Sequence, residues 1–129
     1  WVLVYSLRGE QITSWQINSS CFGIVTAGDK LVVVCKPDLI VFDEEGNKLS
    51  MLSKTIRQYD CISPLDSKSI IVVNFDCENV KRIGIRTGEE LWSNEDDISV
   101  PQSAVYDGHG NILVLGSSGY IHVLDVSTG

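Results

Sequence analysis

The chain has 129 residues, of which 43% are hydrophobic, with 3 Pro and 11 Gly; this composition is typical of a folded domain and excludes disordered and fibrous classes. No apolar run approaches the roughly 18 residues that a spanning helix needs, so no transmembrane helix is predicted. The formal net charge of −7 repels phosphate backbones and anionic lipid heads, which disfavours nucleic acid and membranes as partners.

Short apolar runs separated by turn signals fill the chain from end to end. Residues 1–17 contain two such runs, residues 18–52 contain four, residues 59–94 contain four more, and residues 101–129 contain three. Runs of this length between Gly, Asp and Ser clusters are typical of antiparallel strands. The segment 53–60 has no clean strand pattern, is polar and is interpreted as a connector between blades.

A repeat is visible in four glycines, each of which follows an apolar run that is interpreted as the third strand of a blade. Gly9, Gly46, Gly88 and Gly129 are separated by 37, 42 and 41 residues. A period near 40 residues with no helical pattern is typical of a four-stranded propeller blade. We therefore predict an all-β fold, a β-propeller fragment of about three four-stranded antiparallel blades. It would comprise a half blade, two full blades and an incomplete one.

Two tryptophans occupy the predicted fourth strands. Trp15 lies six residues after Gly9, and Trp92 lies four residues after Gly88. Because six and four have the same parity, both indoles are expected on the same side of their sheets. We predict that they fill the wedge between neighbouring blades; a solvent-facing aromatic platform is the alternative.

The spacing of the four cysteines predicts no metal site, because the sequence has no C-x-x-C pair and no His at zinc-ligand spacing from a Cys. Cys21 and Cys61 open the first strands of their blades and are expected to behave as small buried hydrophobes. If the hairpin turns at Gly28 and Asp29, Cys21 and Cys35 lie opposite each other. A cross-strand disulfide is then the alternative in an oxidising compartment.

The histidines do not form a catalytic arrangement. His109 lies in a predicted turn, and His122 alternates with its apolar neighbours on a strand, where an inter-blade hydrogen bond is expected rather than catalysis. No nucleophile elbow, zinc-protease motif or Gly-rich phosphate loop occurs. We expect this region to be non-catalytic and to hold no cofactor.

Acidic residues cluster at 43–45, 89–90 and 95–97, and the first two clusters lie in or beside predicted hairpin turns. We interpret this edge as a solvated face that keeps the protein soluble. A calcium site is the alternative, although the dense alternating carboxylates of a dedicated loop are missing.

The opposite edge carries the loops between second and third strands and between blades. Basic and aromatic side chains occur there among the acids, and Tyr, Phe and Arg are favoured at interfaces. The candidate partner-binding residues are Lys36, Asp38, Lys54, Arg57, Tyr59, Phe75, Asn79 and Ser118.

The segment from Cys77 to Gly129 resembles NHL-repeat propellers, especially those at the C-terminus of tripartite-motif proteins. The matching sequence segments are GEELWS, VPQSAVYDGHGNILVLG and GYIHVLDVSTG. Within them, the family pattern is matched by Pro101, Asp107, Gly110 and Asn111. The GEELW word also resembles quinoprotein-type propeller repeats, so the six-bladed propeller superfamily is the broader assignment.

This resemblance implies a binding platform for protein or RNA, joined in tripartite-motif proteins to a zinc-binding ubiquitin-ligase region that is not in this sequence. RNA-binding members present a basic face, and the acidic charge departs from that. We therefore predict a protein-interaction module of a larger, ubiquitin-ligase-type protein. The alternative is a quinoprotein-like propeller or a channel-metal hydrolase or lyase, although the predicted channel strands GIVT, ISP and SAVY contain no carboxylate or His.

The N-terminal residues WVLVYSLRGE do not resemble a signal peptide, and a cytoplasmic location is expected. About three blades do not close a propeller, which needs four to eight. We expect the chain to continue in its parent protein into a ring of six blades, or two copies to associate.

Overall fold

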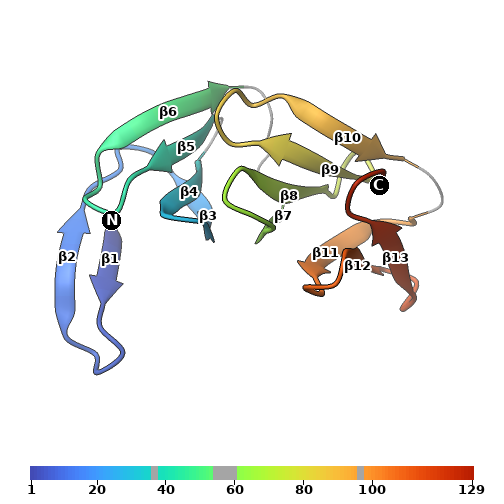
Figure 1. Ribbon diagram of the computed structural model, residues 1–129, viewed down its shortest axis with the longest axis horizontal. Helices are drawn as coiled ribbons and strands as arrows, with labels where there is room; N and C mark the ends of the chain where they lie inside the picture. The colour runs from blue at the N-terminus through green and yellow to red at the C-terminus, as the bar shows by residue number, and fades with distance from the viewer. Residues whose placement is uncertain (36–37, 54–60, 96–97) are drawn as a thin grey trace.

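The computed structural model describes residues 1–35, 38–53, 61–95 and 98–129. Thirteen β-strands and no helix occur in these residues, so no helix among them could cross a membrane. The strands form four antiparallel sheets in chain order, arranged side by side along an arc (Figure 1). The all-β prediction is confirmed.

Each sheet is formed by strands that are consecutive in the sequence. The first sheet contains β1 (Val2–Tyr5) and β2 (Gln11–Trp15). The second contains β3 (Cys21–Ala27), β4 (Lys30–Cys35), β5 (Asp38–Phe42) and β6 (Lys48–Ser53). The third contains β7 (Cys61–Pro64), β8 (Ser69–Asn74), β9 (Asn79–Gly84) and β10 (Glu90–Asn94). The fourth contains β11 (Pro101–Tyr106), β12 (Asn111–Gly116) and β13 (Ile121–Asp125).

The strands of each four-stranded sheet run in order from the inside of the arc to its outer rim. β3 and β7 lie on the inner side, and β6 and β10 form the rim (Figure 1). The centres of the middle strands β4, β5 and β8 are apolar, whereas β9 also carries Lys81 and Arg82; all six residues of β8 are buried. Continuous apolar strands arise because a neighbouring sheet covers each face of the middle strands.

The core is divided into layers between adjacent sheets, and strand alternation assigns residues to them. Val32 and Val34 of β4 belong to the layer shared by the second and third sheets. Val33 and Cys35 of the same strand belong to the layer between the first and second sheets, together with Trp15. A third layer joins the third and fourth sheets.

The last strand of each of the first three sheets packs on a turn glycine of the next sheet. Trp15 packs on Gly46, Leu52 on Gly88 and Trp92 on Gly129. These glycines all have positive φ and lie where a side chain would collide or press against its neighbour. The prediction that both tryptophans fill the wedge between sheets is confirmed.

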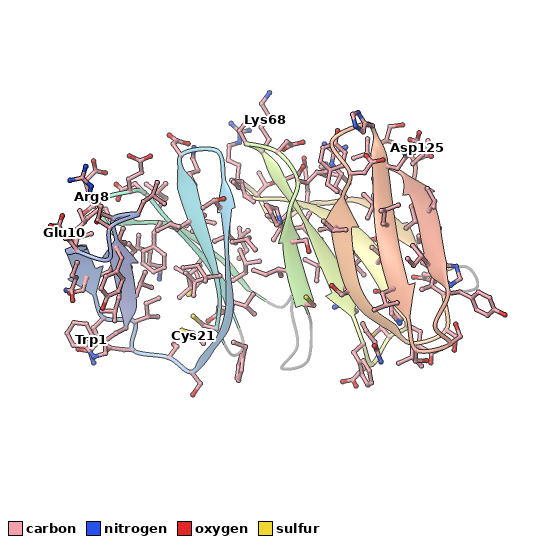
Figure 2. The ribbon with its side chains drawn as sticks, turned by 90° about the horizontal axis from the view of Figure 1, so that it is seen from below. Trp1, Arg8, Glu10, Cys21, Lys68 and Asp125 are labelled. Atoms are coloured by element: carbon pink, nitrogen blue, oxygen red, sulfur yellow. The ribbon has the colours of Figure 1, made fainter. Side chains whose placement is uncertain are left out.

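The arc has two edges, which differ in the connections that they carry. The turn face carries the hairpin turns that follow β1, β3, β5, β7, β9 and β11, and the loop face is the opposite edge. Figure 2 shows Arg8 and Lys68 on the turn face and Trp1 and Cys21 on the loop face.

Two expectations about single polar residues are wrong. Asn79, a candidate partner residue that the sequence assigns to a loop, pairs with Asn74 as the first residue of β9 and is 5% exposed. The inter-blade hydrogen bond expected for His122 does not form at Nε2, which is buried without a partner among the described residues. That nitrogen lies beside Gly116, which has no side chain to offer.

Candidate binding cavity between the second and third sheets

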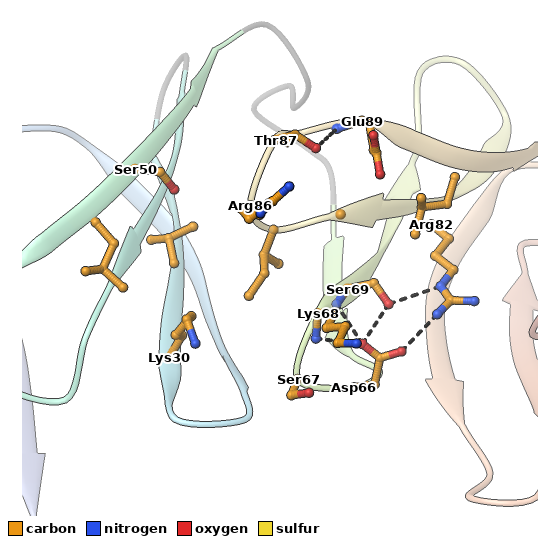
Figure 3. Close-up of a pocket in the computed structure, with 15 residues that line it drawn as sticks. Lys30, Ser50, Asp66, Ser67, Lys68, Ser69, Arg82, Arg86, Thr87 and Glu89 are labelled. Atoms are coloured by element: carbon orange, nitrogen blue, oxygen red, sulfur yellow. Dashed lines mark hydrogen bonds and ion pairs between the residues drawn. The ribbon is translucent and has the colours of Figure 1, made fainter.

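A cavity of about 720 Å³ lies between the second and third sheets and reaches the turn face (Figure 3). Its size is within the range of pockets that bind small molecules and peptide side chains. The second sheet contributes Lys30, Val41, Leu49 and Ser50; the third contributes Asp66, Ser67, Lys68, Ser69, Arg82, Gly84, Ile85, Arg86, Thr87, Glu89 and Leu91.

Besides their shared core layer, the two sheets are in contact at two turns beside the cavity, and both of these contacts use glycine. A Cβ atom on Gly28, in the turn between β3 and β4, would lie 2.8 Å from Ser67 Cβ. Gly88, in the turn between β9 and β10, would place a Cβ 3.3 Å from Leu52. The core layer and these turns together set the separation of the sheets, and the cavity lies beside them.

Part of the cavity wall is apolar. Leu49 of β6 is 52% exposed and Leu91 of β10 is 45% exposed, although both side chains lie on sheets with buried cores. Val41 and Ile85 are buried and line the same space. An apolar group that entered the cavity would cover leucine surface that now faces water, which is favourable.

Asp66 organises the turn between β7 and β8. Its Oδ1 accepts hydrogen bonds from the backbone N–H groups of Lys68 and Ser69, each at 2.7 Å, and from Ser69 Oγ at 2.9 Å. Burial acts to raise the pKa of the Asp66 carboxyl, but these hydrogen bonds and the charge of Arg82 outweigh it and lower the pKa. Asp66 is therefore an ionised structural group at neutral pH.

Arg82 connects this turn to the fourth sheet. Its Nη2 lies 2.9 Å from Asp66 Oδ2, its Nε donates to Ser69 Oγ at 3.0 Å, and its Nη1 donates to the Val126 carbonyl at 3.1 Å. A guanidinium with three fixed partners has little freedom left. Arg82 therefore serves to hold the cavity rim in place.

The other basic side chains of the cavity have fewer ion-pair and hydrogen-bond partners than Arg82. Lys30 pairs with Asp29 at 2.7 Å on the surface. Lys68 and Arg86 form no ion pair with any acid in the described part of the chain. Figure 3 shows Arg86 between the two sheets, with Lys30 across the gap from Lys68. Four basic and two acidic side chains line the cavity, in a chain whose net charge is −7.

This location differs from the one predicted. The sequence assigned the partner surface to the loop face, whereas this cavity reaches the turn face. Glu89, expected as a solvated acid on the turn face, is exposed there and also lines the cavity. A local signal existed, because residues 66–89 hold Lys68, Lys81, Arg82 and Arg86, four of the ten basic residues in the chain. That Lys30 of the second sheet lines the same cavity could be seen only in the folded structure.

None of the sequence-predicted partner residues that the structure describes lines the cavity. Lys36, Lys54, Arg57 and Tyr59 lie outside the described residues. Of the rest, Phe75 and Ser118 are exposed in loop-face turns, Asp38 is half-buried at the start of β5, and Asn79 is buried. The part of the chain that the structure describes contains no cluster of three or more His, Cys, Asp or Glu that could hold a metal.

No known protein family and no curated protein sequence matches the chain. Solved structures do match it. BamB from Moraxella catarrhalis superimposes with a TM-score of 0.72 at 18% identity, over 98% of this chain and 41% of BamB. The WD40 β-propeller domain of Doa1 gives a TM-score of 0.69 at 14% identity, over 86% of this chain and 39% of that domain.

The chain has a β-propeller fold. The computationally designed Ika8 protein matches as well, with a TM-score of 0.68 at 20% identity, over 94% of this chain and 38% of Ika8. This propeller chain thus spans about two fifths of the length of each of these three structures. The predicted β-propeller fold is confirmed, while the six-bladed superfamily and the NHL-repeat assignment stay predictions.

Proposed function

We propose that this chain is a protein-interaction segment of a larger propeller protein, and that its cavity takes an acidic segment of the partner protein. The observation that carries the proposal is the pair Lys68 and Arg86, which have no acidic partner in the described residues and stand beside Leu49 and Leu91. Basic groups and exposed leucines in one cavity suit a ligand that carries both carboxylates and apolar side chains.

The cavity lining carries more basic than acidic side chains, whereas the chain as a whole is acidic. An acidic chain repels acidic ligands in general, so a local excess of positive charge in a cavity guides a carboxylate to that place. Guanidinium and ammonium groups form charge-assisted hydrogen bonds with carboxylates, which are about twice as strong as neutral ones. Arg82 and Asp66 already neutralise each other, which leaves Lys68 and Arg86 as the ligand-facing cations.

Binding of a labelled peptide with alternating Glu and Leu residues tests the proposal, with fluorescence anisotropy as the readout. Arg86→Ala and Lys68→Ala are each expected to weaken binding about tenfold, which corresponds to about 1.4 kcal/mol. Raising the salt concentration should weaken binding further. Arg8→Ala is the matched control, because Arg8 is an exposed cation on the same face outside the cavity.

A peptide in which Gln replaces Glu is expected to bind much more weakly, because it keeps the length and the leucines but loses the charge. Equal losses from Arg8→Ala and Arg86→Ala would show that binding is a general charge effect and would contradict the proposal. Loss from Phe75→Ala with no effect of Arg86→Ala would assign the partner to the loop face instead, as the sequence predicted.

The proposed parent protein is a ubiquitin ligase of the tripartite-motif type. This assignment is supported by the resemblance of residues 77–129 to NHL-repeat propellers, and determination of the coding sequence upstream of Trp1 tests it. A RING and B-box region there would support the assignment. Stoichiometric metal in the channel of the whole propeller, with loss of an activity on chelation, would favour the hydrolase or lyase alternative.

A further inference from the structure

Cys21 and Cys35 face each other across the first hairpin of the second sheet. Their Cα atoms are directly paired between β3 and β4, and their Sγ atoms are 2.8 Å apart. Directly opposed residues of an antiparallel pair project to the same face of the sheet. A disulfide bond is about 2.05 Å long, so the two sulfurs need to approach by less than ~1 Å to form one.

The two thiols differ in their access to solvent. Cys21 is exposed and lines a groove of about 340 Å³ that also includes Trp1, Ile17 and Phe22. Cys35 is buried among Val33, Ile40 and Phe42. The expectation that Cys21 is a buried hydrophobe is therefore wrong, because β3 is the inner strand of its sheet and its first residue opens onto the groove.

We propose that Cys21 and Cys35 form a redox pair that closes to a cross-strand disulfide on contact with a small-molecule disulfide such as oxidised glutathione. This inference is independent of the function of the cavity, which is on the opposite edge of the arc. Figure 2 shows Cys21 on the loop face and Lys68 on the turn face.

The exposed thiol reacts first. The thiolate of Cys21 attacks one sulfur of the oxidant, releases one small thiol and remains as a mixed disulfide. Burial and the hydrogen bond with Cys21 raise the pKa of the Cys35 thiol to about 12, so Cys35 does not begin the reaction. Cys35 Sγ then attacks Cys21 Sγ, and the second small thiol leaves with the proton of Cys35. Two electrons pass from the cysteine pair to the oxidant, and both protein thiols lose their protons.

The other two cysteines provide internal controls. Cys61 packs against the core layer between the third and fourth sheets. Cys77 is exposed in the turn between β8 and β9 and has no cysteine partner in the described residues. Exposure alone would make Cys77 as reactive as Cys21, whereas only Cys21 has a second thiol within reach.

Peptide mapping of the full 129-residue chain tests the proposal directly. Trypsin cleavage at Lys30 separates Cys21 and Cys35 into peptides 9–30 and 31–48, and Cys61 and Cys77 lie in two further peptides. After incubation with oxidised glutathione, peptides 9–30 and 31–48 are expected as one linked species that a reducing agent separates. Cys77 is expected to carry a glutathione adduct or a free thiol.

Variants distinguish the pair from chance oxidation. Cys35→Ser is expected to leave a persistent glutathione adduct on Cys21, and Cys77→Ser is expected to link as the unchanged chain does. The oxidised chain should melt about 10 °C above the reduced chain, because the bond closes a short loop of the unfolded chain. Separate glutathione adducts on Cys21 and Cys35, links that involve Cys61 or Cys77, or unreacted Cys21 beside a modified Cys77 would overturn the proposal.

Discussion

The indole ring of Trp15 lies so close to the backbone of Gly46 that a Cβ atom there would be 2.6 Å from Trp15 Cδ2. Gly46 also has a φ of +85°. Gly46→Ala is therefore expected to combine left-handed backbone strain with a collision between adjacent sheets. We expect a loss of about 3 kcal/mol in the free energy of unfolding, measured by denaturant titration.

Gly9 provides a control for this substitution. It has a φ of +82°, but nothing lies within 4 Å of the position of its Cβ atom. Gly9→Ala should cost only the strain, about 1 kcal/mol. If the two variants lose the same stability, contact between Trp15 and Gly46 does not hold the sheets together.

The two docking tryptophans differ in their hydrogen bonds. Trp92 Nε1 donates to the Val126 carbonyl at 2.9 Å, whereas Trp15 Nε1 is buried without a partner in the described residues. Trp92→Phe and Trp15→Phe remove the same atoms, but only Trp92→Phe loses a hydrogen bond. Trp92→Phe is expected to be more destabilising by about 1 kcal/mol. Thermal unfolding of the two variants measures this difference, and the reverse order would contradict it.

Low pH is expected to lower the free energy of unfolding, because three Asp side chains in or beside turns become protonated. Hydrogen bonds from the side chains of Asn47, Asn111 and Ser127 lower the pKa values of Asp43, Asp107 and Asp125, respectively. A lowered pKa in the folded state means that the unfolded chain binds protons more readily. The stabilisation is complete above the ordinary Asp pKa of about 3.9 and is lost as the pH falls through the lowered values.

Thermal unfolding between pH 7 and pH 2.5 measures this effect. The melting temperature is expected to decrease as the pH is lowered below about 4. Asp107→Asn should make this decrease in melting temperature smaller. Asp76→Asn is the control, since Asp76 is exposed and has no hydrogen bond to another described residue. A pH profile that neither variant changes would contradict the assignment to Asp107.

Glu78 is an exposed residue with a left-handed backbone. Its φ is +51° in the turn between β8 and β9, a conformation that costs a non-glycine residue roughly 1–2 kcal/mol. Glu78→Gly is expected to raise the free energy of unfolding by about 0.5–1 kcal/mol, after the entropy cost of glycine is subtracted. Glu78→Ala should bring no gain, and a gain of equal size would show that charge, not strain, is responsible.

Both ends of the arc present apolar sheet faces. On β13, Ile121 is 64% exposed and Val123 is 62% exposed. Ile121 pairs with Leu115 and Val123 with Leu113, so these side chains share one open face. The isolated 129-residue chain is expected to associate, because exposed apolar faces of this kind bind one another.

Light scattering measures this association, and the double variant Ile121→Glu, Val123→Glu is expected to lower the observed mass. A stable, well-dispersed monomer of the unchanged chain would contradict this expectation. Glu44→Gln, an exposed change in the turn between β5 and β6, should leave the mass unchanged.

The sequence by itself determined the strands, their pairing order and the wedge positions of Trp15 and Trp92. These features are local: alternation sets the face of each side chain, and turn glycines such as Gly46 mark the repeat. Strand ends moved by a residue or two, as at Asn79, because pairing with Asn74 extends β9 and buries a residue that the sequence assigned to a loop.

Only the tertiary structure decided where the cavity is and that Cys21 is exposed. The cavity requires Lys30 of one sheet to face Lys68 and Arg86 of the next, and the spacing between sheets depends on contacts such as that of Gly28 with Ser67. Equivalent strand positions also differ in their surroundings: Cys21 opens onto a groove, whereas Cys61 packs against the core. Alternation assigns a side chain to a face of its sheet, and the neighbouring sheet determines whether that face is covered.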